Sequence, residues 1–262
     1  MSSSILEAMI VASLTGGSIL RKYFEKENFS VIQKSVSYDL VTNIDKESQE
    51  GINAILTQRF PDIPVIGEEG SIQTGRQTRA FYVDPLDGTF NFVHHYPFFS
   101  VSLGYWEENE PVAGVVFDPI RRDLFFAQKG EGAFFNGERI YASDRTSLEG
   151  SYLVTGFPYK EGKHPRIEKE IRAVMKLTDL RVLGSAALEL CYVAKGIIDG
   201  YWEYDLSSWD LAGGVLIAQE AGAVVTNPSG VDFNLFEGDV LAAPPVIHQK
   251  LLEVIKSEQL GI

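Results

Sequence analysis

The chain has 262 residues, of which 45% are hydrophobic and 23% are charged, so its composition excludes a largely disordered protein. The 36 Asp and Glu residues outnumber the 23 Lys and Arg residues, and the formal net charge of −13 argues against binding to nucleic acid or to an anionic membrane surface. A phosphorylated ligand would therefore need bound cations.

The single cysteine, Cys191, excludes an internal disulfide and predicts a buried thiol rather than a nucleophile. The apolar run 5–11 is too short and too interrupted for a membrane span, and no basic region precedes it as in a signal peptide. We therefore expect a cytoplasmic protein. No Pro/Ser-rich linker divides the chain, so we expect a single unit over residues 1–262.

The first half of the chain predicts two helices and a series of strands. Helical spacing of apolar residues predicts a helix over about 4–28 and another over 46–60, with a short strand or hairpin over 31–40 between them. Strands over 64–67 and 80–83 would each end at acidic residues. Three apolar runs from 98 to 127 then predict an antiparallel meander, followed by a turn at Asn136-Gly137.

After Gly150 the pattern changes to alternating strands and helices, which is typical of layered α/β structure. We expect an N-terminal half with an antiparallel sheet, over about 1–145, and a C-terminal α/β half, over about 146–262. The expected elements of the second half are strand 152–155, helix 164–176, strand 180–183, helix 185–195, strand 200–203, helix 208–220, strand 240–242 and a helix after Pro245.

An Asp-Pro-x-Asp-Gly-Thr string follows the strand expected over 80–83. Pro85 cannot donate to a strand ladder, so we expect a turn at which Asp84, Asp87 and the Leu86 carbonyl converge. Such oxygen donors suit Mg²⁺, which prefers hard ligands. Gly88 and Thr89 would then begin a short helix whose free N–H groups could receive a phosphate oxygen.

Each acidic motif taken alone has an ordinary structural explanation. The Asp-rich turn could be a solvated loop, the Glu68-Glu69 pair could lie on the surface, and Asp210 could be a first-turn acid favoured by the helix dipole. Together they would be different, because two like charges about 4 Å apart at an effective dielectric constant of 20 repel by about 4 kcal/mol. A cluster of four must be neutralised by metal or by protons, which predicts a functional site.

The residues from Phe81 to His94 and from Trp209 to Gly222 resemble the two signature segments of the inositol monophosphatase family. The segments 39–45, 66–69 and 184–187 also resemble the family in order and approximate spacing. The resemblance covers nearly the whole chain. It implies an α/β (α+β) fold, a layered α/β/α/β/α sandwich of the type shared with fructose-1,6-bisphosphatase. It also implies a homodimer, lithium sensitivity and two or three Mg²⁺ ions per subunit.

The resemblance assigns roles around the metals. Glu68, Asp84 and the Leu86 carbonyl would hold the first ion, and Asp84, Asp87 and Asp210 the second, while Glu68 could help to hold a looser third. Thr89, supported by Asp45, would orient the water that attacks phosphorus. Lys34 resembles a family lysine near the third ion, although a solvated surface lysine is the alternative.

The resemblance also implies how a substrate is bound. Its contacts would come from Asp87, Gly88, Thr89, Gly184, Ser185, Ala186, Glu203 and Asp210. For Glu203 a plain strand-end acid is the alternative, and His94, His95 and Ser100 are interpreted as packing or hydrogen-bonding residues. Two departures affect the substrate more than the chemistry: Phe90 replaces a frequent second threonine, and Asp205 stands where some relatives have glycine.

The hypothesis that follows is Mg²⁺-dependent hydrolysis of a phosphate monoester, with myo-inositol monophosphate as the first candidate substrate. Fructose 1,6-bisphosphate and the 2'-phosphate of NADP(H) are alternatives at the same site. A hypothesis of another class is a partner-binding regulatory protein that keeps the fold. A calcium-binding module is disfavoured because the sequence has no Asp-x-Asp-x-Asp-Gly loop.

Overall fold

The structure is a computed structural model that describes residues 2–26, 31–33, 40–69, 77–157 and 164–260. Lys34, which the family resemblance places near the third ion, and Asp39, the first residue of the 39–45 segment, lie outside these residues. Within them, the short hairpin expected before the second helix is formed by β1 (Val31–Gln33) and β2 (Leu40–Thr42), which pair in antiparallel fashion.

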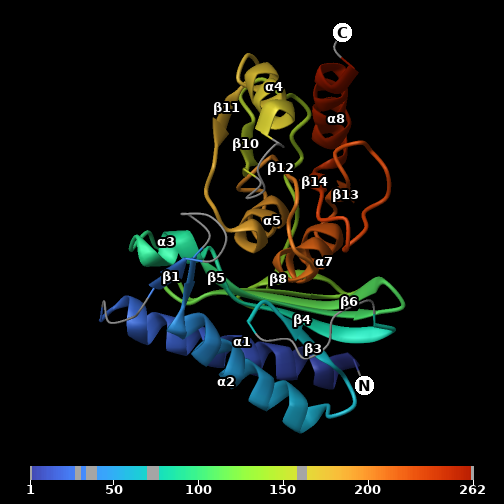
Figure 1. Cartoon of the computed structure of the whole chain (residues 1–262). Coiled ribbons are helices and arrows are strands. Elements are labelled where there is room, and N and C mark those ends of the chain that lie inside the picture. The colour runs from blue at the N-terminus through green and yellow to red at the C-terminus, as the bar shows by residue number, and fades with distance from the viewer. Residues whose placement is uncertain (1, 27–30, 34–39, 70–76, 158–163, 261–262) are drawn as a thin grey trace.

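The helices and sheets form five layers (Figure 1). Two long helices cover the outer face of a large sheet, a middle helical layer separates that sheet from a smaller one, and two further helices cover the smaller sheet. This arrangement confirms the predicted α/β/α/β/α sandwich. The helices are α1 (Ser2–Phe24) and α2 (Asn43–Arg59) outside, α5 (Ala186–Ala194) and α7 (Gly214–Glu220) in the middle, and α4 (His164–Val174) and α8 (Pro245–Leu260) on the small sheet.

The large sheet has seven strands in the order β3-β4-β5-β6-β7-β8-β9. They are β3 (Val65–Gly67), β4 (Arg79–Asp87), β5 (Ser100–Glu107), β6 (Glu110–Asp118), β7 (Asp123–Gln128), β8 (Gly132–Phe135) and β9 (Glu138–Ile140). The sheet is antiparallel, as expected, from β4 to β9, but at one edge β3 runs parallel to β4.

The small sheet has five strands in the order β11-β10-β12-β14-β13. They are β10 (Tyr152–Thr155), β11 (Asp179–Arg181), β12 (Gly200–Glu203), β13 (Val224–Thr226) and β14 (Val240–Ala243). β10 lies parallel to β11 and β12, whereas β14 is antiparallel to β12 and β13. β13 was not expected from the sequence.

Several helix boundaries differ from the sequence prediction. α1 ends at Phe24 rather than near residue 28, and α2 begins at Asn43 rather than at Lys46. The single helix expected over 208–220 is divided at Gly213 into α6 (Ser208–Ala212) and α7. The backbone at this division is pressed against the large sheet: a Cβ on Gly213 would lie 2.8 Å from the Leu103 carbonyl oxygen of β5.

By length and composition alone, the segment Ser4–Phe24 would suffice to cross a membrane. In the structure, however, this segment packs against α2 and the large sheet and forms part of a hydrophobic core. Ala8, Met9, Ala12 and Leu20 are fully buried, together with side chains of α2 and the large sheet. Among the described residues no other helix meets the same criteria, and this one is accounted for as a core helix.

Candidate active site

The position of Asp84 follows from the alternation of side chains along β4. Ala80 and Tyr82 pack into the core between the two sheets, whereas Phe81 and Val83 pack into the core beneath α1 and α2. Successive strand residues point to opposite faces, so Asp84 is directed to the side of the sheet on which α6 lies. Asp84 is buried there, close enough to Asp210 of α6 for the two acids to influence each other's pKa.

The expectation that Pro85 ends the strand ladder is wrong, because β4 continues to Asp87. Asp84 pairs with Ser102 and Asp87 with Ser100, and the register shifts between them. The shift accommodates the residue that has no N–H to donate. Inside it, the Pro85 carbonyl accepts a hydrogen bond from Ser48 Oγ (3.0 Å), and the Leu86 N–H donates to Asp84 Oδ1 (3.0 Å).

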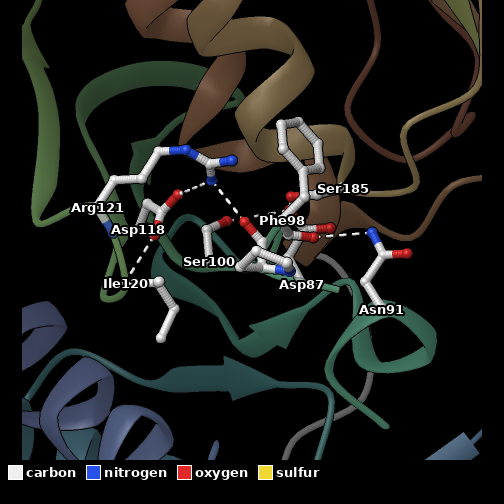
Figure 2. Close-up of polar contacts among 9 residues, drawn as sticks. Asp87, Asn91, Phe98, Ser100, Asp118, Ile120, Arg121 and Ser185 are labelled. Atoms are coloured by element: carbon white, nitrogen blue, oxygen red, sulfur yellow. Dashed lines mark hydrogen bonds and ion pairs between the residues drawn. The ribbon is translucent and has the colours of Figure 1, made fainter. Parts of the chain in front are cut away.

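Asp87 connects the large sheet to α5 (Figure 2). Its Oδ2 accepts from Ser185 Oγ, from Ser100 Oγ (3.1 Å) and from the Ala187 N–H (3.1 Å), and its Oδ1 accepts from the Ala186 N–H (3.1 Å). Burial raises the pKa of Asp87 to about 6, although these hydrogen bonds act in the opposite direction. The predicted 184–186 turn and Asp87 therefore meet, and Ser100 is a hydrogen-bonding residue.

Four acidic groups influence one another at this place. Burial raises the pKa of Asp84 well above its ordinary value, and the charges of Glu68, Asp87 and Asp210 raise it further. The pKa of Asp210 is also raised well above its ordinary value, first by burial and then by Glu68 and Asp87. Glu68 follows β3, Asp84 and Asp87 belong to β4, and Asp210 lies in α6, so distant segments contribute to one cluster.

The cluster is not arranged as a finished metal site. Within the described part of the chain, no three His, Cys, Asp or Glu side chains are placed so that they would hold an ion as they stand. Asp87 is turned towards α5, and Asp210 Oδ2 accepts from the Ser207 N–H (2.8 Å) as part of a capping box. The donor chemistry nevertheless fits a hard divalent cation, since it offers carboxylate oxygens whose crowding a positive charge would relieve.

Thr89 and Asp45 lie together beside the acidic cluster. Gly88, with a φ of 92°, precedes the short helix α3 (Thr89–Val93), as the sequence predicts. Thr89 Oγ lies 3.2 Å from Asp45 Oδ1 and 3.0 Å from the Leu86 carbonyl oxygen, and it can donate to either. Asp45 is fully buried in the first turn of α2. The structure thus brings a hydroxyl group, its acceptor and the Leu86 carbonyl into one place.

Glu203, at the end of β12, is a buried acid rather than a solvated one. Its Oε2 accepts from Tyr201 Oη (2.7 Å), and burial raises the pKa of Glu203 to about 7 despite this hydrogen bond. The charge of Asp87 also raises it, which places Glu203 near the other acids. Gly156 leaves the space that Glu203 occupies, because a Cβ there would lie 2.2 Å from the Glu203 carboxyl carbon.

Some residues singled out from the sequence lie apart from this cluster. His94 and His95 are exposed; their rings lie 4.4 Å from that of Phe90 and 5.5 Å from that of Phe24, respectively, so they pack as expected. Asp205 has a φ of 63°, in the left-handed region that favours glycine, which explains why a glycine suits this position. Cys191 is buried, as predicted.

Two residues at the site were missed in the sequence. Asn91 Nδ2 donates to the carbonyl oxygens of Phe98 (2.8 Å) and Leu183 (2.8 Å), and Figure 2 shows it reaching the Phe98 carbonyl. Glu189 Oε1 accepts from the N–H groups of Leu183 (3.2 Å) and Gly184 (3.1 Å). In the sequence, Glu189 could have been noticed as the lone charged residue inside an otherwise apolar helical run, because a buried charged residue usually has a specific partner.

The sequence model of the inositol monophosphatase family matches residues 1–260. The chain belongs to the inositol monophosphatase family. It is a phosphatase acting on small phosphorylated substrates, and the family is generally Mg²⁺-dependent.

Two curated relatives and one solved structure illustrate the range of this family. The chain is 38% identical over 255 residues to "Nus factor SuhB" of Pasteurella multocida, covering 96% of each chain. It is 35% identical over 256 residues to "Fructose-1,6-bisphosphatase/inositol-1-monophosphatase" of Aquifex aeolicus, covering 96% of this chain and 95% of that protein. The crystal structure of suhB from Bartonella henselae superposes with a TM-score of 0.91 at 37% identity, covering 97% and 98% of the two chains.

Proposed function

We propose that this inositol monophosphatase family member hydrolyses myo-inositol monophosphate with the help of Mg²⁺. The observation that carries the proposal is the group of carboxyls from buried Asp84 and Asp87 and half-buried Glu68 and Asp210, beside the Thr89–Asp45 pair. A chain of net charge −13 has little to attract a phosphate at such a place unless divalent cations are bound there. In this proposal residues 1–262 fold as a single unit.

The proposed ion ligands are those that the family resemblance assigns. Glu68, Asp84 and the Leu86 carbonyl would hold one ion, and Asp84, Asp87 and Asp210 a second; a looser third would lie near Glu68 and Lys34. When bound, divalent cations withdraw charge from the phosphoryl oxygens and acidify water, so neither a serine nor a histidine nucleophile is required. Asp87 and Asp210 would reach this arrangement by turning away from their present N–H donors.

The remaining roles belong to side chains of the chain itself. Thr89 would accept a proton from the attacking water while its own hydroxyl hydrogen goes to buried Asp45. Gly88 and Thr89 would contact the phosphate, and Gly184, Ser185, Ala186 and Glu203 would contact the hydroxyl groups of the substrate. Asp87 and Asp210 would contact the substrate as well as the metal ions. Fructose 1,6-bisphosphate and the 2'-phosphate of NADP(H) remain alternative substrates, because a buried acid such as Glu203 can bind hydroxyl groups of several sugars.

The proposal is tested by phosphate release from a panel of phosphate monoesters, ranked by kcat/KM. We expect release that requires Mg²⁺, is abolished by a chelator and is inhibited by lithium. Asp84→Asn and Asp210→Asn should each lower kcat at least about 100-fold, whereas Asp179→Asn, at an exposed position on β11, should not. A rate that chelation leaves unchanged would show the metal mechanism to be wrong.

A second candidate function is a partner-binding role. It is favoured by the name of the Pasteurella multocida relative, a Nus factor. This alternative would replace the first if the purified protein released no phosphate from any compound and co-purified stoichiometrically with a macromolecule. Within the first proposal, the protein is a cytoplasmic homodimer that binds neither nucleic acid nor membrane, which size measurement and fractionation would test.

A further inference from the structure

The turn at Leu183 and Gly184 is held from two sides by side chains that the proposed reaction does not use. On one side, Glu189 Oε1 accepts from both N–H groups of the turn, at 3.2 and 3.1 Å. On the other side, Asn91 Nδ2 donates to the Leu183 carbonyl oxygen at 2.8 Å and lies 3.3 Å from the Gly184 carbonyl oxygen. Both N–H groups of the turn and the Leu183 carbonyl group are thereby occupied, and these bonds hold Gly184 at its φ of 85°.

The turn immediately precedes the groups that meet Asp87. Ser185 donates to Asp87 through its side chain, and Ala186 donates through its N–H. The turn also touches the start of α3, because a Cβ on Gly88 would lie 3.0 Å from the Gly184 carbonyl oxygen. Its position therefore sets how closely residues 184–186 approach the site.

Glu189 is an unusual residue to find in this position. It is 1% exposed, and among the described residues its Oε2 has no hydrogen-bond partner. The pKa of Glu189 is raised well above its ordinary value by burial and, next, by the charge of Glu203. A buried acid with one unpartnered oxygen costs stability. If this position only filled space in the core, leucine would be more stable there. The presence of an acid therefore calls for a role other than packing.

We propose that Glu189 is a positioning residue that sets the affinity for the hydroxyl groups of the substrate by holding the 183–184 turn. The inference rests on the proposed function and deepens it. Glu189 acts through the turn and does not touch the phosphate. Asp87 also accepts a hydrogen bond from Ser100, which the turn does not hold, so we expect Glu189 to affect substrate affinity much more than the cleavage chemistry.

The test compares two substrates in two variants. Glu189→Leu keeps the volume but leaves two N–H groups without an acceptor, and we expect its KM for myo-inositol 1-phosphate to rise about tenfold. Its KM for p-nitrophenyl phosphate, which has no polyol hydroxyl groups, should stay within about twofold of the wild-type value, as should kcat for both compounds. Glu189→Gln, which keeps an acceptor oxygen and matches the neutral acid, should restore the KM.

Glu220 provides a matched control. It accepts from two backbone N–H groups in the same manner, those of Gly130 and Gly132 at 2.7 Å each, on the turn between β7 and β8. Glu220→Leu should lower stability without changing either KM. Asn91→Ala removes the other support of the 183–184 turn, and should reproduce the KM effect if Glu189→Leu does not fold.

A second measurement does not depend on activity. Hydrogen exchange of the Leu183 and Gly184 amides should become at least about tenfold faster in Glu189→Leu and remain slow in Glu189→Gln. Unchanged exchange in Glu189→Leu would overturn the inference, as would an equal loss of kcat on both substrates. If the wild-type protein hydrolyses neither compound, the proposed function fails, and the exchange measurement still decides whether Glu189 holds the turn.

Discussion

Thr89 has one hydroxyl hydrogen and two acceptors within reach, Asp45 at 3.2 Å and the Leu86 carbonyl at 3.0 Å. Its lone pairs are therefore free to accept from a water molecule while the hydrogen is held. We predict that Thr89→Ala lowers kcat by about 10²–10³-fold, because the attacking water loses its acceptor. Steady-state kinetics at saturating Mg²⁺ measure this effect.

Thr89→Ser is the matched control, since it keeps the hydroxyl group on the same backbone. It should retain kcat within about tenfold, and neither variant should melt more than a few degrees below the wild type, because Thr89 is only half-buried. A Thr89→Ala variant with nearly full activity would remove Thr89 from the reaction.

At the scale of residues, the sequence could indicate the site residues that belong to a recognisable motif. Asp84 and Asp87 stand in one recognisable string, and Asp210 stands in another. Asn91 could not be assigned, because one of its partners is the backbone carbonyl of Leu183, 92 residues away. Glu189 could not be assigned, because its partners are backbone N–H groups, which can belong to residues of any type. Which carbonyl or N–H group lies opposite a side chain depends on packing between layers, which no local pattern expresses.

At the scale of elements, the contact between β5 and α6 determines where Asp210 lies. Gly104 of β5 faces the end of α6 so closely that a Cβ on it would lie 2.4 Å from the Ala212 carbonyl oxygen. On the same strand, Trp106 Nε1 donates to that carbonyl at 3.0 Å. The absence of a side chain at Gly104 thus brings α6, and Asp210 with it, against the sheet that carries Asp84.

We predict that Gly104→Ala destabilises the protein by about 1–3 kcal/mol, or roughly 2–12 °C in Tm, because α6 must move outward. The same movement should separate Asp210 from Asp84 and weaken Mg²⁺ binding. Differential scanning calorimetry and titration with Mg²⁺ measure the two effects.

Gly200→Ala, on β12, is the control for an added methyl group in a buried strand. Its Cβ would lie 3.0 Å from Leu153 Cδ2, the end of a flexible side chain rather than backbone. It should leave Mg²⁺ affinity unchanged. Equal Mg²⁺ affinity in both variants would contradict the role given to the contact between β5 and α6.

The elements that the sequence predicted well are those with a strong pattern of their own. β10 and β12 have the predicted bounds, Tyr152–Thr155 and Gly200–Glu203, because apolar runs between turn signals identify them. The division of the 208–220 helix and the shifted register at Pro85 were not foreseen. Both features depend on the neighbouring strand β5. The helix is divided where its backbone contacts β5, and the register shifts where Pro85 has no N–H to donate to β5.

At the scale of the whole molecule, the buried acids make stability depend on pH. The pKa of Asp87 is raised to about 6 and that of Glu203 to about 7, and those of Asp84 and Asp210 are also raised. Between the ordinary pKa near 4 and these raised values, the folded protein binds more protons than the unfolded chain. The free energy of unfolding therefore falls as the pH rises.

We predict that the metal-free protein is less stable at pH 8 than at pH 5. Between pH 5 and pH 8 the raised pKa of Asp87, about 6, contributes on its own about 1.4 kcal/mol, which would lower Tm by roughly 3–6 °C. Mg²⁺ should raise Tm strongly at pH 8, where the acids are charged, and weakly at pH 5. Melting curves with a chelator or with Mg²⁺ at both values test this. A metal-free Tm that stays constant or rises over this range would contradict it.

The central claim is that Asp84, Asp87 and Asp210 converge to hold divalent cations. Anomalous diffraction from crystals grown with Mn²⁺ in place of Mg²⁺ tests it most directly. We predict a strong anomalous peak within about 2.0–2.3 Å of carboxylate oxygens of these three residues. Peaks that lie only elsewhere, with these three carboxyl groups still bound to their protein donors, would contradict it.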